Sequence, residues 1–134
     1  MNNELQDINV ESMSDLDSPL KIKELLPLKS NDVNFILKSR ETINNILHKK
    51  SDKTLLIIGP CSIHDTDAAI EYAKRVSKLR KKVGSKIELL MRCYFEKPRT
   101  KIGWKGLISD PFLNNSNQIL EGIKISRKLL IDIT

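Results

Sequence analysis

The chain has 134 residues, a formal net charge of +6, a hydrophobic content of 40% and a charged content of 30%. These values are typical of a globular protein, and no apolar run approaches the roughly 20 residues that a membrane-spanning helix needs. Neither a secretory signal nor an arginine-rich transit peptide is visible near the N-terminus. We therefore expect a cytoplasmic protein that does not contact a membrane, in which the two cysteines are thiols or metal ligands rather than a disulfide framework.

The N-terminal third has one strong pattern. Residues 1–18 are polar and unpatterned, which predicts no regular element. The mixed segment 20–28 contains a proline near its end and predicts a short strand or a turn. Over residues 31–50 apolar side chains recur at helical spacing, which predicts one amphipathic helix.

The middle of the chain predicts a strand, a helix and a second strand. Residues 54–58 form an unbroken apolar run, which favours a strand covered on both faces. A helical pattern follows over 68–84, and β-forming residues return over 87–95. A right-handed crossover makes the second strand parallel to the first. Cys61 and Arg92 are then expected to lie together at the carboxyl ends of the strands.

The last part of the chain predicts a long irregular connection and one more helix. The connection has about twenty residues, which inside a compact domain is typical of a functional loop. Trp104, the only tryptophan, is expected to anchor it. A last helical pattern covers residues 119–130. Two strands leave sheet edges unpaired, so these elements predict the beginning of an α/β fold.

Cations cluster where the second predicted strand ends: Arg92, Lys97, Arg99, Lys101 and Lys105. Fixed like charges at this density repel one another unless an anion lies between them. The cluster therefore predicts a site for one or two phosphate groups. Cys61 faces these cations, which would lower the pKa of its thiol and suit either a nucleophile or a metal ligand. A small buried filler is the alternative for a lone cysteine after a strand.

Other kinds of site have weaker support. Cys61 and His64 have a spacing used in zinc sites, but no second pair completes such a site. Cys93 should face away from Arg92 and is expected to pack in the core. The sequence has no glycine-rich phosphate loop, and its aromatics are too few for a base-stacking surface, so no nucleic-acid partner is expected.

Three stretches resemble the signature blocks of class I 3-deoxy-D-arabino-heptulosonate 7-phosphate (DAHP) synthases. They are residues 58–65, IGPCSIHD; residues 91–100, MRCYFEKPRT; and residues 103–111, GWKGLISDP. The resemblance implies a (β/α)8 TIM barrel preceded by an N-terminal extension. Residues 1–50 would be the extension, and residues 51–134 the start of the barrel, with only its first two βα units.

The resemblance also implies an activity. Enzymes of this family condense phosphoenolpyruvate with D-erythrose 4-phosphate to give DAHP and phosphate, the first step of the shikimate pathway to chorismate and the aromatic amino acids. Cys61 would be a ligand of a divalent metal ion, manganese or iron. Arg92 and Lys97 would bind the phosphate and carboxylate of phosphoenolpyruvate, with Lys97 also serving catalysis. Arg99 and Thr100 would bind the phosphate of erythrose 4-phosphate.

Further expectations follow from the same resemblance. Lys97 and Pro98 would lie close to the reacting end of erythrose 4-phosphate. An aromatic amino acid would act as feedback inhibitor, and residues 106–111 favour the tryptophan-sensitive type. A homo-oligomer is expected at full length.

Family chains are well over twice as long, so the chain is interpreted as an N-terminal fragment that is inactive alone. The alternative function is that of a truncated, non-catalytic remnant that keeps only anion binding or subunit contacts. A basic nucleic-acid module is a third reading, which a salt-dependent affinity for unrelated nucleic acids would support.

Overall fold

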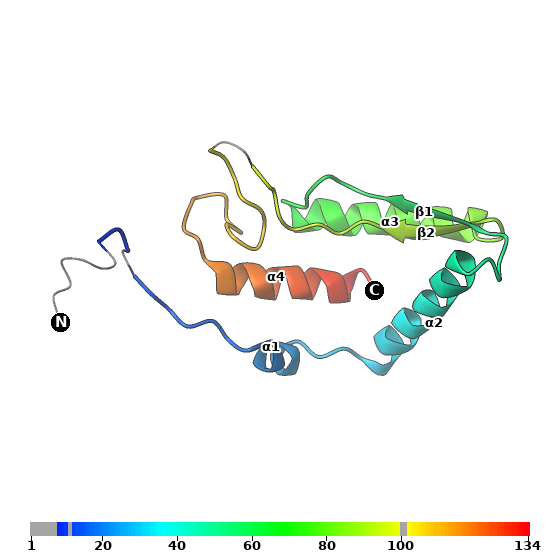
Figure 1. Ribbon diagram of the computed structural model, residues 1–134, viewed down its shortest axis with the longest axis horizontal. Helices are drawn as coiled ribbons and strands as arrows, with labels where there is room; N and C mark the ends of the chain where they lie inside the picture. The colour runs from blue at the N-terminus through cyan, green and yellow to red at the C-terminus, as the bar shows by residue number, and fades with distance from the viewer. Residues whose placement is uncertain (1–7, 11, 100–101) are drawn as a thin grey trace.

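The computed structural model describes residues 8–10, 12–99 and 102–134. Its elements are, in chain order, α1 (Pro19–Leu25), α2 (Ser30–Leu47), β1 (Thr54–Ile58), α3 (Thr66–Val83), β2 (Ile87–Met91) and α4 (Ile119–Asp132). Figure 1 shows α3 running beside the strand pair, with α4 next to it and α1 beyond α4. None of the helices in the described ranges is long and apolar enough to cross a membrane.

The segment predicted as a short strand or a turn is helix α1, so that prediction was wrong. The Ser18 hydroxyl accepts a hydrogen bond from the Lys21 backbone N–H at 3.3 Å, and Pro19 occupies the first turn, where its missing N–H costs nothing. Pro27 lies beyond the helix and ends it rather than interrupting a strand.

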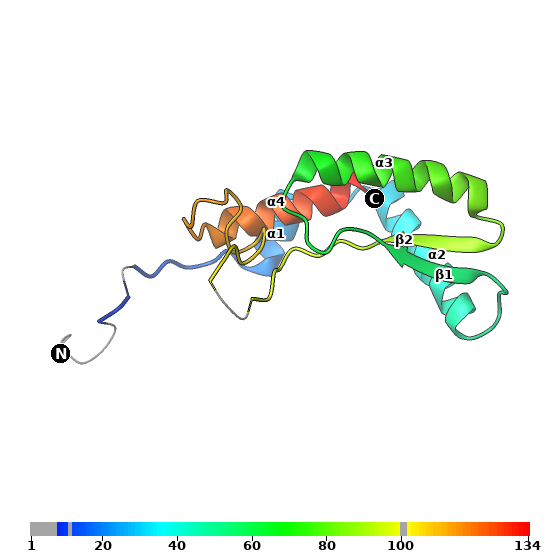
Figure 2. The same cartoon turned by 90° about the horizontal axis from the view of Figure 1, so that it is seen from above.

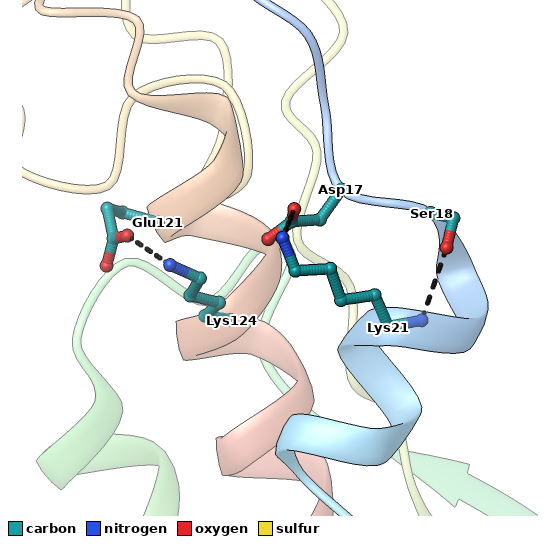
Figure 3. Close-up of polar contacts among 5 residues, drawn as sticks. All are labelled: Asp17, Ser18, Lys21, Glu121 and Lys124. Atoms are coloured by element: carbon teal, nitrogen blue, oxygen red, sulfur yellow. Dashed lines mark hydrogen bonds and ion pairs between the residues drawn. The ribbon is translucent and has the colours of Figure 1, made fainter.

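Helix α1 has one buried side chain, Ile22, and its C-terminal end is hydrogen-bonded to α4. Arg127 of α4 donates from Nε to the Leu26 carbonyl oxygen at 2.8 Å, which satisfies a carbonyl at the end of α1. In Figure 3 the two helices lie side by side, each with its own ion pair. These pairs are Asp17 with Lys21 at 2.5 Å and Glu121 with Lys124 at 2.7 Å.

Strands β1 and β2 pair in parallel, as the crossover rule predicted. Thr54 pairs with Ile87 and Ile58 with Met91, at the two ends of the ladder. The second strand ends at Met91, earlier than the predicted end at Phe95. The reason is that its partner strand has already turned away at a Gly-Pro pair, where the ladder cannot continue.

The prediction that the first strand is covered on both faces is wrong for the described residues. Helix α3 lies along one side of the strand pair (Figure 2). On β1, Leu56 is 42% exposed and Ile57 is 59% exposed. An unbroken apolar run indicates that a strand can be buried on both faces, but the covering elements must come from elsewhere in the fold.

The core lies beyond the carboxyl ends of the strands, where α3, α4 and the strand-end loops meet. Its buried members are Ile63, Ala69, Leu107 and Leu129. Helix α4 approaches the 106–110 turn very closely, since a Cβ on Gly122 would clash with the Ile108 carbonyl oxygen. The core therefore supports the loops directly, and these loops carry the predicted site.

Candidate functional site

Cys61 and Arg92 lie together at the carboxyl ends of the strands, as predicted. The Arg92 guanidinium donates from Nη1 to the Pro60 carbonyl oxygen at 2.7 Å and also to the Cys61 carbonyl oxygen. The backbones of the two strand ends touch here, because a Cβ on Gly59 would lie 2.6 Å from the Arg92 carbonyl oxygen. Only glycine permits this approach, so the Gly-Pro-Cys turn fixes the position of Arg92.

Lys97 contacts the Cys61 thiol directly. Its ammonium group donates from Nζ to Sγ at 2.9 Å. This hydrogen bond and the charge of Lys97 lower the pKa of Cys61, with smaller contributions from the charges of Arg92 and Arg99, while desolvation opposes them. The predicted lowering is confirmed, and an exposed thiol in this environment has the thiolate character of a nucleophile or a metal ligand.

Arg92 and Cys93 have different surroundings, which agrees with the prediction that Cys93 faces away from Arg92. The Arg92 guanidinium carbon lies 4.7 Å from the centre of the Tyr94 ring, so the ring supports the side chain through a cation–π contact. Cys93, which lies between Arg92 and Tyr94 in the sequence, packs against the core, and burial raises the pKa of its thiol. Its predicted packing role is confirmed, and the two cysteines have opposite environments.

Two further hydrogen bonds join the loops that follow the two strands, and a third lies within the second loop. The Ile63 N–H donates to the Tyr94 carbonyl oxygen at 2.8 Å, and the Ser62 hydroxyl donates to the Glu96 carbonyl oxygen at 3.0 Å. Within the second loop, the Lys97 N–H donates to the Lys105 carbonyl oxygen at 2.8 Å. These bonds hold the cationic loop next to Cys61, although none of the described residues of the loop belongs to a helix or strand.

Lys97 also lines a hollow of about 720 Å³. Its lining includes three cations and three residues of the following loop: Lys97, Arg99, Lys105, Trp104, Asp110 and Asn115. Arg99 donates from Nε to the Trp104 carbonyl oxygen at 3.3 Å. Lys97 therefore borders two sites: the strand ends that carry Cys61 and Arg92, and this hollow.

Some predicted site residues are not part of this arrangement. Thr100 and Lys101 lie outside the described residues. Pro98 is exposed beside Lys97. His64 meets Trp104 edge to face, with ring centres 6.4 Å apart, which gives it a packing role in the loop.

Sequence reasoning missed Asp110, which is only 4% exposed. Its carboxylate accepts hydrogen bonds from the Asn114 and Asn115 N–H groups at 3.2 and 3.1 Å. The Asp-Pro pair at 110–111 indicates the start of a turn. That signal could have drawn attention to the residue, although not to its burial.

The donor set for a metal ion is incomplete within residues 8–10, 12–99 and 102–134. These residues contain no group of three or more His, Cys, Asp or Glu side chains able to hold a metal. Cys61 is one soft donor of lowered pKa, which fits a single ligand position of a transition metal.

Parallel strands joined by a helix, with cations and a thiol at their carboxyl ends, define an α/β protein whose strand-end loops are chemically suited to anionic ligands. The sequence narrows this class further. Residues 13–131 match the DAHP synthetase I family, and the chain belongs to that family.

Similar proteins support the assignment. The chain is 46% identical over 133 residues to the Phe-sensitive phospho-2-dehydro-3-deoxyheptonate aldolase of Escherichia coli strain K12, covering 99% of this chain and 38% of that protein. It is also 46% identical, over 130 residues, to the Trp-sensitive enzyme of Buchnera aphidicola, covering 97% of this chain and 36% of that protein.

The fold agrees with a solved relative. The phospho-2-dehydro-3-deoxyheptonate aldolase of Francisella tularensis SCHU S4 superposes with a TM-score of 0.89 at 43% identity, covering 93% of this chain and 37% of that chain. The chain thus spans a little over a third of the length of the relatives it matches.

Proposed function

We propose that this chain forms part of an enzyme that condenses phosphoenolpyruvate with D-erythrose 4-phosphate, giving DAHP and phosphate at the start of aromatic amino-acid biosynthesis. The observation that carries the proposal is the contact of Lys97 with Cys61 beside Arg92, at the carboxyl ends of parallel strands. The names of the relatives support it, since they are phospho-2-dehydro-3-deoxyheptonate aldolases.

The proposal includes a fold for the whole enzyme. Strands β1 and β2 would be the first two of a (β/α)8 barrel, with residues 1–50 as an extension before it and residues 51–134 as its start. Barrel enzymes carry their sites at the carboxyl ends of the strands. The position of Cys61 and Arg92 fits this rule. The exposed apolar face of β1 would then be covered by the rest of the barrel.

The cations have complementary roles in this proposal. Arg92 and Lys97 bind the phosphate and carboxylate of phosphoenolpyruvate, while Arg99 and Thr100 bind the phosphate of erythrose 4-phosphate near Pro98. Two anionic substrates repel each other, and fixed cations between them offset that repulsion and orient the reacting carbons.

Lys97 is suited to the reaction centre because it borders both places. When C3 of phosphoenolpyruvate attacks the aldehyde carbon, negative charge develops on the aldehyde oxygen, and an ammonium group can donate a proton there. Water adds to the former enol carbon, which becomes the keto group as inorganic phosphate leaves. The reaction consumes one water molecule, and its carbon, oxygen and phosphorus atoms balance.

A divalent metal ion, manganese or iron, belongs to the proposal with Cys61 as one ligand. The lowered pKa of this thiol fits the role, since a coordinating thiol must be deprotonated. The bound ion would polarise the aldehyde carbonyl. The remaining ligands would come from residues outside those that the structure describes.

Regulation is also proposed. An aromatic amino acid would inhibit the enzyme, which we expect to be a cytoplasmic homo-oligomer. Relatives named Phe-sensitive and Trp-sensitive are equally identical to this chain, at 46%. The tryptophan-sensitive type, favoured by residues 106–111, therefore stays a prediction that inhibition assays with each aromatic amino acid would test.

The direct test is an assay of the complete polypeptide that contains these residues. We expect phosphate release that requires both substrates and stops when the metal is chelated. Binding of phosphoenolpyruvate without any phosphate release would instead favour the non-catalytic alternative. Release that occurs with either substrate alone would contradict the proposal.

The 134-residue chain by itself should not be active. The edge of β1 and side chains such as Leu56 and Ile57 are exposed. The free energy gained by burying apolar surface should therefore not offset the ordering entropy, which costs roughly 1–2 kcal/mol per residue. We expect an aggregated or molten chain. A soluble monomer with a cooperative thermal transition would show that these residues form a self-sufficient domain.

A further inference from the structure

Trp104 links the two strand-end loops through three different parts of the residue. Its carbonyl oxygen accepts the hydrogen bond from Nε of Arg99 at 3.3 Å. Its indole Nε1 donates to the Asp110 carbonyl oxygen at 2.8 Å. Its ring meets His64 edge to face and packs against the core. Trp104, which binds the Arg99 guanidinium, is therefore itself held by Asp110 and by His64.

Asp110 holds the turn on which the indole depends. Its carboxylate binds the Asn114 and Asn115 N–H groups, and its own N–H donates to the Gly106 carbonyl oxygen at 2.9 Å. The turn contains residues in the left-handed region, with φ of 54° at Leu113 and 59° at Asn115. Leucine rarely adopts this conformation, so the carboxylate stabilises a strained backbone. Leu113 and Asn115 also line the hollow next to Arg99.

Arg99 needs such support because it is exposed and its side chain is long. The bond to Trp104 uses only Nε. Among the described residues, the terminal nitrogens of Arg99 form no hydrogen bond and stay available to an anion. Restricting a flexible arginine before its ligand arrives lowers the entropy lost on binding.

We propose that Trp104 is a positioning residue, held by Asp110, that keeps Arg99 ready to bind the phosphate group of the second substrate. The inference rests on the proposed function for the identity of that substrate. Because Trp104 acts through Arg99, its effect should be specific for the ligand that Arg99 binds.

The first test is Trp104→Phe in the complete enzyme, which keeps an aromatic ring and removes the indole N–H. We expect the KM for erythrose 4-phosphate to rise about tenfold, the order of one hydrogen bond's contribution. The KM for phosphoenolpyruvate and kcat should stay within about twofold. Tyr72→Phe, a matched aromatic change on α3, should alter none of these. Equal increases in both KM values, or no increase, would overturn the proposal.

A double-mutant cycle separates positioning from general loosening of the loop. In an Arg99→Ala background, Trp104→Phe should cause no further rise in the KM for erythrose 4-phosphate, because both changes act through one guanidinium. If the second change costs the same factor in both backgrounds, the indole does not act through Arg99.

Asp110 provides a second pair of variants. Asp110→Asn keeps an oxygen acceptor for the two N–H groups and should stay close to the parent enzyme. Asp110→Ala removes it and should reproduce the effect of Trp104→Phe. If Asp110→Asn raises the KM for erythrose 4-phosphate as much as Asp110→Ala does, the hydrogen bonds of the turn do not cause the effect.

Binding of inorganic phosphate, measured by calorimetry, distinguishes this inference from the proposed function. We expect Trp104→Phe to weaken phosphate binding about tenfold whether or not the enzyme condenses the two substrates. A parent protein that binds phosphate without turnover would contradict the proposed function alone. A parent enzyme that is active, with unchanged phosphate affinity in Trp104→Phe, would contradict the inference alone.

Discussion

At the amino end of β2, Glu88 is 4% exposed and forms ion pairs with Arg80 and, at 3.9 Å, with Lys53. Arg80 also lies over the Phe35 ring, with its guanidinium carbon 5.4 Å from the ring centre. The two cations at this end of the sheet thus have a buried carboxylate as their counter-ion. These contacts link α2, α3 and the strand pair, so the charged residues at the amino end of β2 have a structural role.

At the carboxyl end of the same strands the cations have different partners. Arg92, Lys97 and Arg99 donate to backbone carbonyls and to the Cys61 thiol. No carboxylate among the described residues forms an ion pair with them. Carbonyls and a thiol orient a cation without cancelling its full charge, so that charge remains available to an anionic ligand. The counter-ion, rather than the number of cations, distinguishes the two ends.

The largest effect should come from Cys61→Ala in the complete enzyme. Loss of a thiolate ligand should lower turnover by about a hundredfold or more, with loss of bound metal. The matched control is Cys93→Ala, which removes a packed thiol without touching the cations and should keep both. Full metal content and turnover in purified Cys61→Ala protein would contradict the ligand assignment.

Glu88→Gln should affect stability but not the reaction. Removing the buried charge leaves Arg80 and Lys53 without a counter-ion. Because both cations are about one third exposed, we expect a loss of about 2 kcal/mol in the free energy of unfolding, below the cost for a fully buried pair. Urea titration measures this change.

A control variant and a binding measurement complete that experiment. Glu71→Gln, at an exposed ion pair with Arg75, should leave the unfolding midpoint unchanged. The affinity of Glu88→Gln protein for inorganic phosphate should match that of the parent. A weaker phosphate affinity would mean that the two ends of the sheet are coupled.

Inorganic phosphate should stabilise the enzyme through the carboxyl end only. At a concentration ten times its Kd, phosphate should add about 1.4 kcal/mol to the free energy of unfolding, seen as a higher thermal midpoint. Arg99→Met should reduce this gain, whereas Arg80→Met, the same change at the other end, should preserve it. An equal reduction in both variants would remove the distinction between the two clusters.

The smallest effect is a displacement along the pH axis. Since Lys97 lowers the pKa of Cys61, the thiolate persists to lower pH than in an ordinary thiol. In metal-free enzyme, Lys97→Met should therefore move the pH profile of Cys61 alkylation by iodoacetamide to higher pH. Lys105→Met, which removes a cation that does not contribute to the shift, should leave the profile in place. No displacement in Lys97→Met would show that the contact does not set the thiol's acidity.

The sequence by itself determined the order of the long elements. Periodicity placed the helices now seen as α2, α3 and α4, and the crossover rule placed β1 and β2 in parallel. These are local patterns and a handedness constraint, so they need no knowledge of distant contacts. They were enough to bring Cys61 and Arg92 to one edge of the sheet. Helix α1 was missed because Pro27 was taken to interrupt the segment, whereas the Ser18 cap before Pro19 was not taken as a helix start.

Only the tertiary structure decided how the side chains meet. The contact of Lys97 with Cys61 joins residues 36 positions apart, through a loop whose course depends on several backbone hydrogen bonds. The burial of Asp110 depends in the same way on the packing of its loop. Sequence periodicity reports which face of a helix or strand is apolar, but irregular loops have no period. Their geometry, and with it the fine structure of this site, follows from long-range packing and hydrogen bonding alone.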